Sequence, residues 1–312
     1  MSYLAAFAKA LPGRAVTNEE LAARLGCTTD WIFNACGIEQ RRYVPDGMSV
    51  ADLAAEAGRA CLSSAGVSPG ELGMVIVSSG SSPRRFPGPA AEVASLLGTA
   101  DLPALDLPIA SAGSLFGMAL AADLAPLYGP ILVIASEVMS GLLSREPLDR
   151  NAAILFGDGA GAVLVHPNQG LARVLGSLIS SDGSFSKDLT LEWDGILLMN
   201  GKSIILQASR KIPRVVRQLL EKHSLKPDQI EVFLMHQANQ NLLNRVAEAL
   251  EVPQERFFSN IRKYGNTSSA SMLIAAEEWA ATTNKGVRQL ICFVSFGAGF
   301  HWGAMAAQIE HT

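Results

Sequence analysis

The stretch that decides the fold is Leu105-Asp-Leu-Pro-Ile-Ala-Ser-Ala-Gly-Ser-Leu-Phe-Gly-Met-Ala-Leu-Ala-Ala-Asp123, in which a short apolar strand turns sharply into a helix of small and apolar residues. Ser111 stands at the turn. Its small neighbours permit a tight backbone bend, and the free N–H groups of the following helix place partial positive charge beneath the side chain. This geometry suits a nucleophile. Serine is also a preferred helix N-cap, so an ordinary strand-turn-helix with a capping serine remains an alternative at this point.

Composition limits the class of protein. The chain has 312 residues, of which 49% are hydrophobic, so it can bury the core of one large layered domain or of two similar halves. The formal net charge is −4 and no basic run occurs, which argues against nucleic acid as the main partner.

The apolar segments and the cysteines indicate a cellular compartment. No apolar run reaches the roughly 18 to 20 residues that span a bilayer, and the first residues lack a basic leader, so we expect a cytoplasmic protein with no membrane partner. The four cysteines show neither paired CxxC spacing nor the histidine partners of a zinc site, so we expect no metal site and reduced thiols, with Cys61 and Cys292 in the core.

Local patterns in the first 80 residues predict several elements. Thr17 is placed to cap a helix with Glu20 answering three residues later, and Thr28 begins a second helix in the same way. Residues 50–65 carry small residues at helical spacing, and residues 72–80 form an apolar run typical of a buried strand.

Segments at one fixed offset indicate an internal duplication. The pairs separated by 159 residues are Met74 with Phe233, Val133 with Cys292, and Ser111 with Ala270. We therefore predict two copies of one strand-helix unit, an N-terminal half at residues 1–168 that carries the nucleophile elbow and a C-terminal half at 169–312 that carries a histidine and an asparagine. Loops at equivalent strand ends of such halves would meet near a pseudo-twofold axis.

His236 and Asn266 complete a candidate catalytic set with Ser111. His236 closes the apolar strand at residues 232–235, and Asn266 lies between a glycine and small hydroxyl residues, so we expect all three side chains in loops at matching strand ends. An imidazole N–H and an amide NH₂ can donate two hydrogen bonds to one oxygen, which stabilises an enolate or oxyanion. A nucleophile at Ser111 would then complete an acyl-transfer site.

Two glycine loops resemble phosphate cradles only superficially. Phe156-Gly-Asp-Gly-Ala-Gly-Ala and Phe296-Gly-Ala-Gly-Phe lack both GxGxxG spacing and a following Lys-Ser/Thr pair. We interpret them as tight turns beneath the site, and we assign Asp158 no catalytic role.

Taken together, these residues resemble the 3-oxoacyl-ACP synthase III condensing enzymes of the thiolase superfamily over essentially the whole chain. The motifs that carry the resemblance are Thr17-Asn-Glu-Glu-Leu, Thr29-Asp-Trp-Ile with Gly37-Ile-Glu-Gln-Arg, Phe86-Pro, the elbow at 106–113, Phe156-Gly-Asp-Gly-Ala-Gly-Ala, His236-Gln-Ala-Asn, Gly265-Asn-Thr-Ser, and Phe296-Gly-Ala-Gly with Trp302-Gly. The resemblance implies an α/β, thiolase-like, duplicated five-layer αβαβα fold and a homodimer.

The resemblance also implies a reaction and its substrates. An acyl group would pass from an acyl-CoA or an acyl carrier protein thioester to the elbow residue, and a malonyl-type thioester would then decarboxylate and condense with it; no other cofactor is implied. Trp31 would stack on the adenine of coenzyme A, and Phe86 would reach across the dimer to the partner's acyl pocket. The other substrate-binding residues implied are Arg150, Asn239, Phe296 and Gly297.

This sequence departs from the family at informative positions. The family's nucleophile is a cysteine, whereas Ser111 is a hydroxyl that needs a general base, for which His236 is the candidate. Ala35 replaces an arginine that helps to hold coenzyme A. Basic residues that face the carrier protein in the family appear here as Leu206, Asn241 and Ala249, and Arg245, one helical turn from Asn241, is placed to compensate.

Three functional hypotheses follow. The first is a condensing enzyme of secondary metabolism, in which Ser111 is a native or an engineered replacement of the catalytic cysteine. The second is a serine-dependent acyltransferase. The third is a catalytically silent partner subunit of a heterodimeric ketosynthase, against which the retention of both His236 and Asn266 counts.

Overall fold

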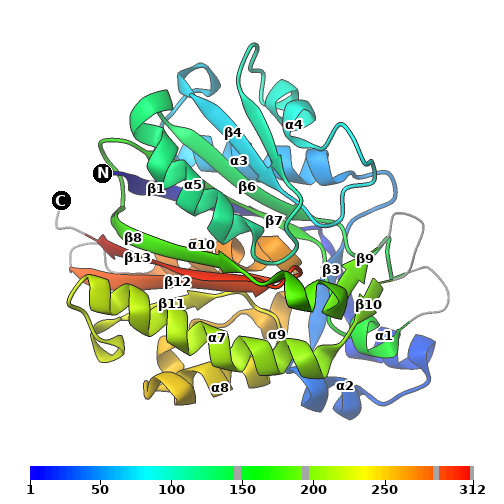
Figure 1. The fold of residues 1–312 in the computed structure, drawn as a ribbon. Coiled ribbons are helices and arrows are strands. Elements are labelled where there is room, and N and C mark those ends of the chain that lie inside the picture. The colour runs from blue at the N-terminus through cyan, green and yellow to red at the C-terminus, as the bar shows by residue number, and fades with distance from the viewer. Residues whose placement is uncertain (144–148, 192–196, 284–287, 310–312) are drawn as a thin grey trace.

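Nine strands form one mixed sheet in a computed structural model that describes residues 1–143, 149–191, 197–283 and 288–309 (Figure 1). Their order across the sheet is β11-β12-β13-β8-β1-β7-β6-β4-β5. The strands are β1 (Tyr3–Ala10), β4 (Met74–Ser78), β5 (Ala104–Leu107), β6 (Ile131–Glu137), β7 (Gly159–His166), β8 (Ala172–Ser181), β11 (Val232–Met235), β12 (Gln289–Gly297) and β13 (His301–Ile309).

The sheet consists of two sections with matching strand order. The order β1-β7-β6-β4 in one section corresponds to β8-β13-β12-β11 in the other, and only two residue pairs, Tyr3 with Arg173 and Leu4 with Ala172, join β1 to β8. Residue 168 lies between β7 and β8; the proposed boundary there stays a prediction. The two ladders differ in register, because Met74 pairs with Ile131, whereas Phe233 pairs with Cys292. The offset of 159 residues is therefore not kept through both strands.

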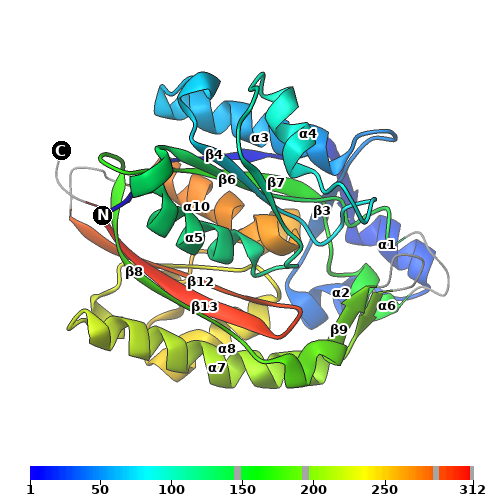
Figure 2. The ribbon, with the colours of Figure 1, turned by 45° about the horizontal axis from the view of Figure 1, so that its top comes forward.

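Helices complete five layers (Figures 1 and 2). Helices α5 (Gly113–Tyr128) and α10 (Ser271–Thr282) lie between the two sheet sections and contact strands of both. Helices α3 (Val50–Ala65) and α4 (Ala90–Leu96) cover the N-terminal section, and α7 (Gly201–Lys222) and α8 (Gln240–Leu250) lie on the far side of the other. This arrangement confirms the predicted five-layer αβαβα fold.

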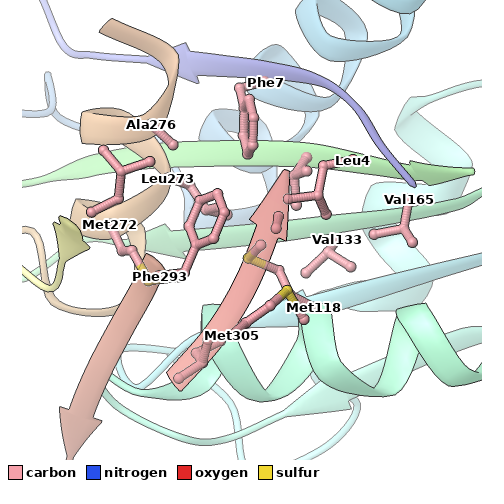
Figure 3. Close-up of a cluster of buried hydrophobic side chains, with 14 of the residues drawn as sticks. Leu4, Phe7, Met118, Val133, Val165, Met272, Leu273, Ala276, Phe293 and Met305 are labelled. Carbon is pink, nitrogen blue, oxygen red and sulfur yellow. The ribbon is translucent and has the colours of Figure 1, made fainter. Parts of the chain in front are cut away.

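The central core explains why α5 and α10 are apolar on nearly all sides. Figure 3 shows Met118 of α5 and Met272 and Leu273 of α10 packed among side chains from both sheet sections, including Phe7 and Phe293. The last two rings lie 5.9 Å apart. A helix that is buried on both faces needs apolar residues all round instead of one apolar stripe.

Shorter elements make up the rest of the described secondary structure. These are β2 (Arg14–Thr17), α1 (Asn18–Leu25), α2 (Thr29–Cys36), β3 (Gln40–Tyr43), η1 (Pro69–Glu71), α6 (Arg150–Ala153), η2 (Gly183–Asp188), β9 (Leu189–Leu191), β10 (Leu197–Met199), η3 (Pro227–Gln229), η4 (Gln254–Arg256), α9 (Ile261–Tyr264) and η5 (Ser268–Ala270).

Several local predictions are confirmed. The Thr17 and Thr28 side chains cap α1 and α2 by accepting from the N–H groups of Glu20 and Trp31, and α3 spans the predicted residues 50–65. Cys61 and Cys292 are buried, and burial raises the pKa of each thiol to about 12. No helix in the described ranges is both long and apolar enough to span a bilayer.

One local prediction is wrong. Asn266 does not follow a strand, because it lies after the short helix α9 and just before η5. The place of a strand equivalent to β5 is taken by a single bridge between Phe257 and Phe233. The turn at Asn266 still precedes α10, as the turn at Ser111 precedes α5.

Candidate active site

Ser111 occupies a strained turn between β5 and α5. Its φ of 66° lies in the left-handed region, which costs a non-glycine residue about 1–3 kcal/mol and persists only where neighbours enforce it. Two hydrogen bonds do so here: Ser111 N donates to Ser268 Oγ at 3.1 Å, and Ser295 Oγ donates to Ser111 O at 2.9 Å. Ser111 is not the helix cap, because Ala112 occupies the N-cap position and makes no side-chain cap bond.

Three glycines allow the chain to close around this turn. A Cβ at Gly297 would lie 1.9 Å from Ala110 O, one at Gly113 would lie 1.8 Å from Ser78 Oγ, and one at Gly80 would lie 2.6 Å from Ala110 Cβ. Such contacts are far shorter than real Cβ atoms make, so these positions need glycine because of close approach. The predicted tight turn at residues 296–299 therefore lies directly against the elbow.

His236 follows β11 immediately and is buried, with 2% of its surface exposed. Its Nδ1 lies 2.6 Å from Ser271 Oγ, and its ring meets the edge of Phe296 at 5.3 Å between centroids. Burial lowers the pKa of His236 to about 3, and a backbone hydrogen bond at Ser268 partly opposes the shift. The imidazole is therefore neutral at physiological pH.

The orientation of the Asn266 amide follows from one hydrogen bond. Asn266 Oδ1 accepts from Ser268 N at 2.8 Å, whereas Nδ2 makes only a long contact of 3.5 Å with Ala238 O. Asn266 N donates to Leu155 O, and Gly157 N donates to Asn266 O, which ties the turn to the loop after α6. The donor end of the amide is thus the end that remains for a ligand.

The three candidate catalytic residues are all buried, and all of them line one pocket. Its lining is mostly apolar with a few polar groups, as in ordinary small-molecule sites. The lining residues are Ser111, Leu155, Phe156, Phe185, Asp188, Leu189, Met199, Gly201, Ile204, Ile205, His236, Ala238, Asn239, Leu242, Asn266, Phe296, Gly297, Ala298, Gly299 and Phe300.

The remaining predicted site residues divide into two groups. Asn239, Phe296 and Gly297 line this pocket, and Asn239 also caps α8 and donates to Ala35 O at 2.9 Å. Trp31, Arg150 and Phe86 do not line it. Trp31 is 41% exposed on α2. Arg150 donates to the carbonyls of Leu25 and Gly26, in the turn between α1 and α2.

Phe86 lies apart from the pocket, on the loop after β4. It is 85% exposed. It is not among the residues that line the pocket within one chain, and its role across a dimer stays a prediction.

Sequence reasoning missed four polar residues that hold the site together. Ser268, Ser271 and Ser295 supply the contacts to Ser111, His236 and Asn266 described above, and Glu137 anchors two neighbouring loops. The cluster of small hydroxyl residues after Asn266 was a signal that could have identified Ser268 and Ser271. Asp158, to which we assigned no catalytic role, accepts hydrogen bonds from Val44 N, Ser140 N and Ser140 Oγ. No group of three potential metal ligands occurs in the described part of the chain.

Comparisons with known proteins identify the family. The family models for 3-oxoacyl-[acyl-carrier-protein] synthase III and for its C-terminal region match residues 105–183 and 220–309. A beta-ketoacyl-[acyl-carrier-protein] synthase III from Oleidesulfovibrio alaskensis is 33% identical over 97% of this chain and 98% of its own length. The chain belongs to the 3-oxoacyl-ACP synthase III family. Its relatives are condensing transferases.

Solved structures of this family agree in fold. The 3-oxoacyl-[acyl-carrier-protein] synthase III from Aquifex aeolicus matches with a TM-score of 0.92 at 31% identity, covering 99% of this chain and 100% of that one. The priming beta-ketosynthase of the R1128 polyketide biosynthetic pathway matches with a TM-score of 0.92 at 27% identity, covering 100% of this chain and 97% of that one.

Proposed function

We propose that this 3-oxoacyl-ACP synthase III family member binds an acyl thioester and a malonyl-type thioester in the pocket at Ser111 and joins them by decarboxylative Claisen condensation. The observation that carries the proposal is the convergence of Ser111, His236 and Asn266 on one mostly apolar pocket. The likeness to a polyketide-priming ketosynthase favours a role in secondary metabolism.

In this proposal His236 and Asn266 act as hydrogen-bond donors. Loss of CO₂ from a malonyl thioester leaves an enolate, whose oxygen would accept from the imidazole and from Asn266 Nδ2. The enolate carbon then attacks the acyl carbonyl carbon, and the acyl-bearing oxygen or sulfur leaves. A neutral imidazole can fill this role, because with Nδ1 against Ser271 Oγ the other ring nitrogen, Nε2, can carry the proton that is donated to the enolate oxygen.

Ser111 is proposed to be the acyl acceptor and a slow one. A serine hydroxyl needs a base that takes its proton, and a histidine whose pKa lies at about 3 is a weak base. Asn266 also lacks the charge with which an aspartate stabilises an imidazolium. Acylation is therefore the step that we expect to limit the protein with serine at position 111.

We propose coenzyme A and carrier-protein thioesters as donors. Trp31 and Arg150 lie at the corner formed by α1 and α2, where an adenine could stack on the exposed indole. The outer face of α7, whose first residue lines the pocket, carries the exposed residues Lys202, Arg210, Arg214 and Arg217. Helix α7 holds six Lys or Arg residues and one Glu, which suits an acidic carrier protein.

Intact-mass spectrometry tests the proposal. The parent protein and Ser111→Cys are incubated with a panel of acyl-CoA and acyl-carrier thioesters. We expect the cysteine form to gain a stable acyl mass while the serine form stays largely unmodified. Rapid acylation of the parent that is lost in Ser111→Ala would instead favour a serine-dependent acyltransferase. Failure of both forms with every donor would overturn the proposal and favour the silent partner subunit.

A further inference from the structure

Glu137 is a fully buried carboxylate that the proposed mechanism does not use. It ends β6, and none of its side-chain surface is exposed. No ion pair to it occurs in the described part of the chain, so its neutralising contacts there are hydrogen bonds alone. A buried charge is costly unless it is fully hydrogen-bonded, so a carboxylate kept at this position indicates a specific requirement.

The two oxygens of Glu137 hold two separate loops. Oε1 accepts from Ser269 Oγ at 2.5 Å and from Ser269 N at 3.3 Å, in η5. Oε2 accepts from Ser81 Oγ at 2.6 Å, in the loop after β4. Gly80 N donates to both oxygens, at 3.1 and 3.0 Å. One side chain therefore links a loop of the N-terminal sheet section to the segment that precedes α10.

Both of these loops contact the elbow directly. Ser268, the neighbour of Ser269, accepts the hydrogen bond from Ser111 N at 3.1 Å. Gly80 packs so closely on the residue before Ser111 that an added Cβ would lie 2.6 Å from Ala110 Cβ. Gly80, Ala110, Ser111 and Ser268 also line one small cavity, which shares Ser111 with the main pocket. Moving either loop would thus move Ser111 relative to an acyl group.

We propose that Glu137 is a positioning residue, which sets the geometry of residue 111 by fixing the Gly80 loop and η5 on either side of it. This inference rests on the proposed function in one respect: residue 111 is taken as the acyl acceptor. Glu137 touches no reacting atom in this scheme. A displacement of about 1 Å at a reacting group is enough to cost one to two orders of magnitude in rate.

The test uses the Ser111→Cys background, in which the elbow can be probed without acyl chemistry. The rate at which iodoacetamide alkylates the introduced thiol reports the local geometry of the elbow, and acylation by an acyl-CoA reports productive positioning. Glu137→Met removes both acceptor oxygens at similar volume, and Glu137→Gln keeps one. We expect both rates to fall about tenfold or more in Glu137→Met and by a smaller factor in Glu137→Gln, with the KM for acyl-CoA nearly unchanged.

Asp158→Asn is the matched control. Asp158 is equally buried and is also held by hydrogen bonds, but these reach Val44 and Ser140 instead of the loops beside Ser111. We expect it to lower thermal stability and to leave the alkylation rate of the introduced thiol within about twofold, since Val44 and Ser140, which Asp158 holds, make no hydrogen bond to Ser111. Should Glu137→Met fail to fold, Glu137→Gln and Ser269→Ala carry the same comparison.

Two results would overturn the inference. One is a folded Glu137→Met, or a folded Glu137→Gln and Ser269→Ala pair, in which both rates stay at the parent level. The other is an equal loss in Asp158→Asn, which would mark the effect as general destabilisation. If the thiol at position 111 accepts no acyl group from any thioester, the proposed function fails, and the alkylation series still decides the role of Glu137.

Discussion

Ser268 Oγ accepts a hydrogen bond from the backbone N–H of Ser111 at 3.1 Å, and both residues have positive φ, 47° and 66°. The two turns therefore brace each other, although 157 residues separate them in the chain. Ser268 N also fixes the Asn266 amide. One serine thus connects the elbow of the N-terminal half to the amide donor of the C-terminal half.

Ser268→Ala should therefore slow acylation at position 111 as well as lower the stability of the fold. It leaves the buried N–H of Ser111 without an acceptor, which costs about 1–3 kcal/mol. In the Ser111→Cys background we expect slower acylation in addition. Ser136→Ala is the matched control, because Ser136 is fully buried and donates to Val50 O at 2.8 Å, away from the pocket. Urea unfolding measures the stability of each variant, and intact-mass kinetics measures its acylation rate. Equal acylation rates in Ser268→Ala and Ser136→Ala would contradict a role of Ser268 in positioning residue 111.

His236 and Asn266 should be required for malonyl decarboxylation whatever residue stands at position 111. Removing one donor to a developing oxyanion typically costs about 10²–10³ in rate. We therefore expect His236→Ala and Asn266→Ala each to abolish most CO₂ release from a malonyl thioester while substrate binding survives. Release of labelled CO₂ is the measurement, and decarboxylation of the His236→Ala variant at the parent rate would refute the donor-pair assignment.

The buried His236 should also make the fold sensitive to acid. Its pKa is about 3 in the folded protein and about 6.5 in an unfolded chain, so the unfolded state binds more protons between these values and stability falls as pH falls. At pH 5 the expected loss is about 2 kcal/mol relative to pH 7.

His166 and His301 have lowered pKa values as well, because of partial burial, and act in the same direction. The comparison of the parent with His236→Asn isolates the contribution of His236. Urea unfolding at pH 7 and pH 5 should show a weaker pH dependence in the variant. An equal loss of stability between pH 7 and pH 5 in the two proteins would contradict the assignment of the acid sensitivity to His236.

The sequence was sufficient for the fold and for the convergence of Ser111, His236 and Asn266 on one pocket, but not for the residues that hold them in place. Glu137 ends an apolar strand, and a charged residue there is ordinarily expected to face solvent. Its partners Gly80 and Ser269 lie 57 and 132 residues away in the chain, so no local pattern points to them. The position of Asn266 after a helix was missed because its turn matches that of Ser111 while the element before it differs.

The basic face of α7 should contribute to carrier-protein binding. Arg210→Glu with Arg214→Glu reverses two exposed charges on the helix that begins at the pocket. We expect a higher KM for a carrier-linked thioester, an effect that weakens with added salt, and an unchanged KM for acyl-CoA. The control is Lys222→Glu with Lys226→Glu, which makes the same change in charge at and just beyond the far end of α7. Docking on this face would be contradicted if the two double variants raised the KM for the carrier-linked thioester equally, or if the Arg210 and Arg214 variant left that KM unchanged.

β5 is the last strand at one side of the sheet within the described residues, and its outer edge should be the contact of a homodimer. An unpaired strand edge exposes backbone hydrogen-bonding groups, and here Leu105 on β5 is 41% exposed, while Phe86 on a neighbouring loop is 85% exposed. Pairing of two β5 strands would cover Leu105 and bring Phe86 near the partner's acyl pocket. We therefore expect a dimer by light scattering at micromolar concentration and a monomer of Leu105→Lys. Leu198→Lys is the control, because Leu198 is 62% exposed on β10 and its substitution should leave the dimer intact.

Phe86→Ala should keep the dimer but change which acyl chains are accepted by the Ser111→Cys form. A monomeric parent protein would contradict the dimer and, with it, any role of Phe86 in the site.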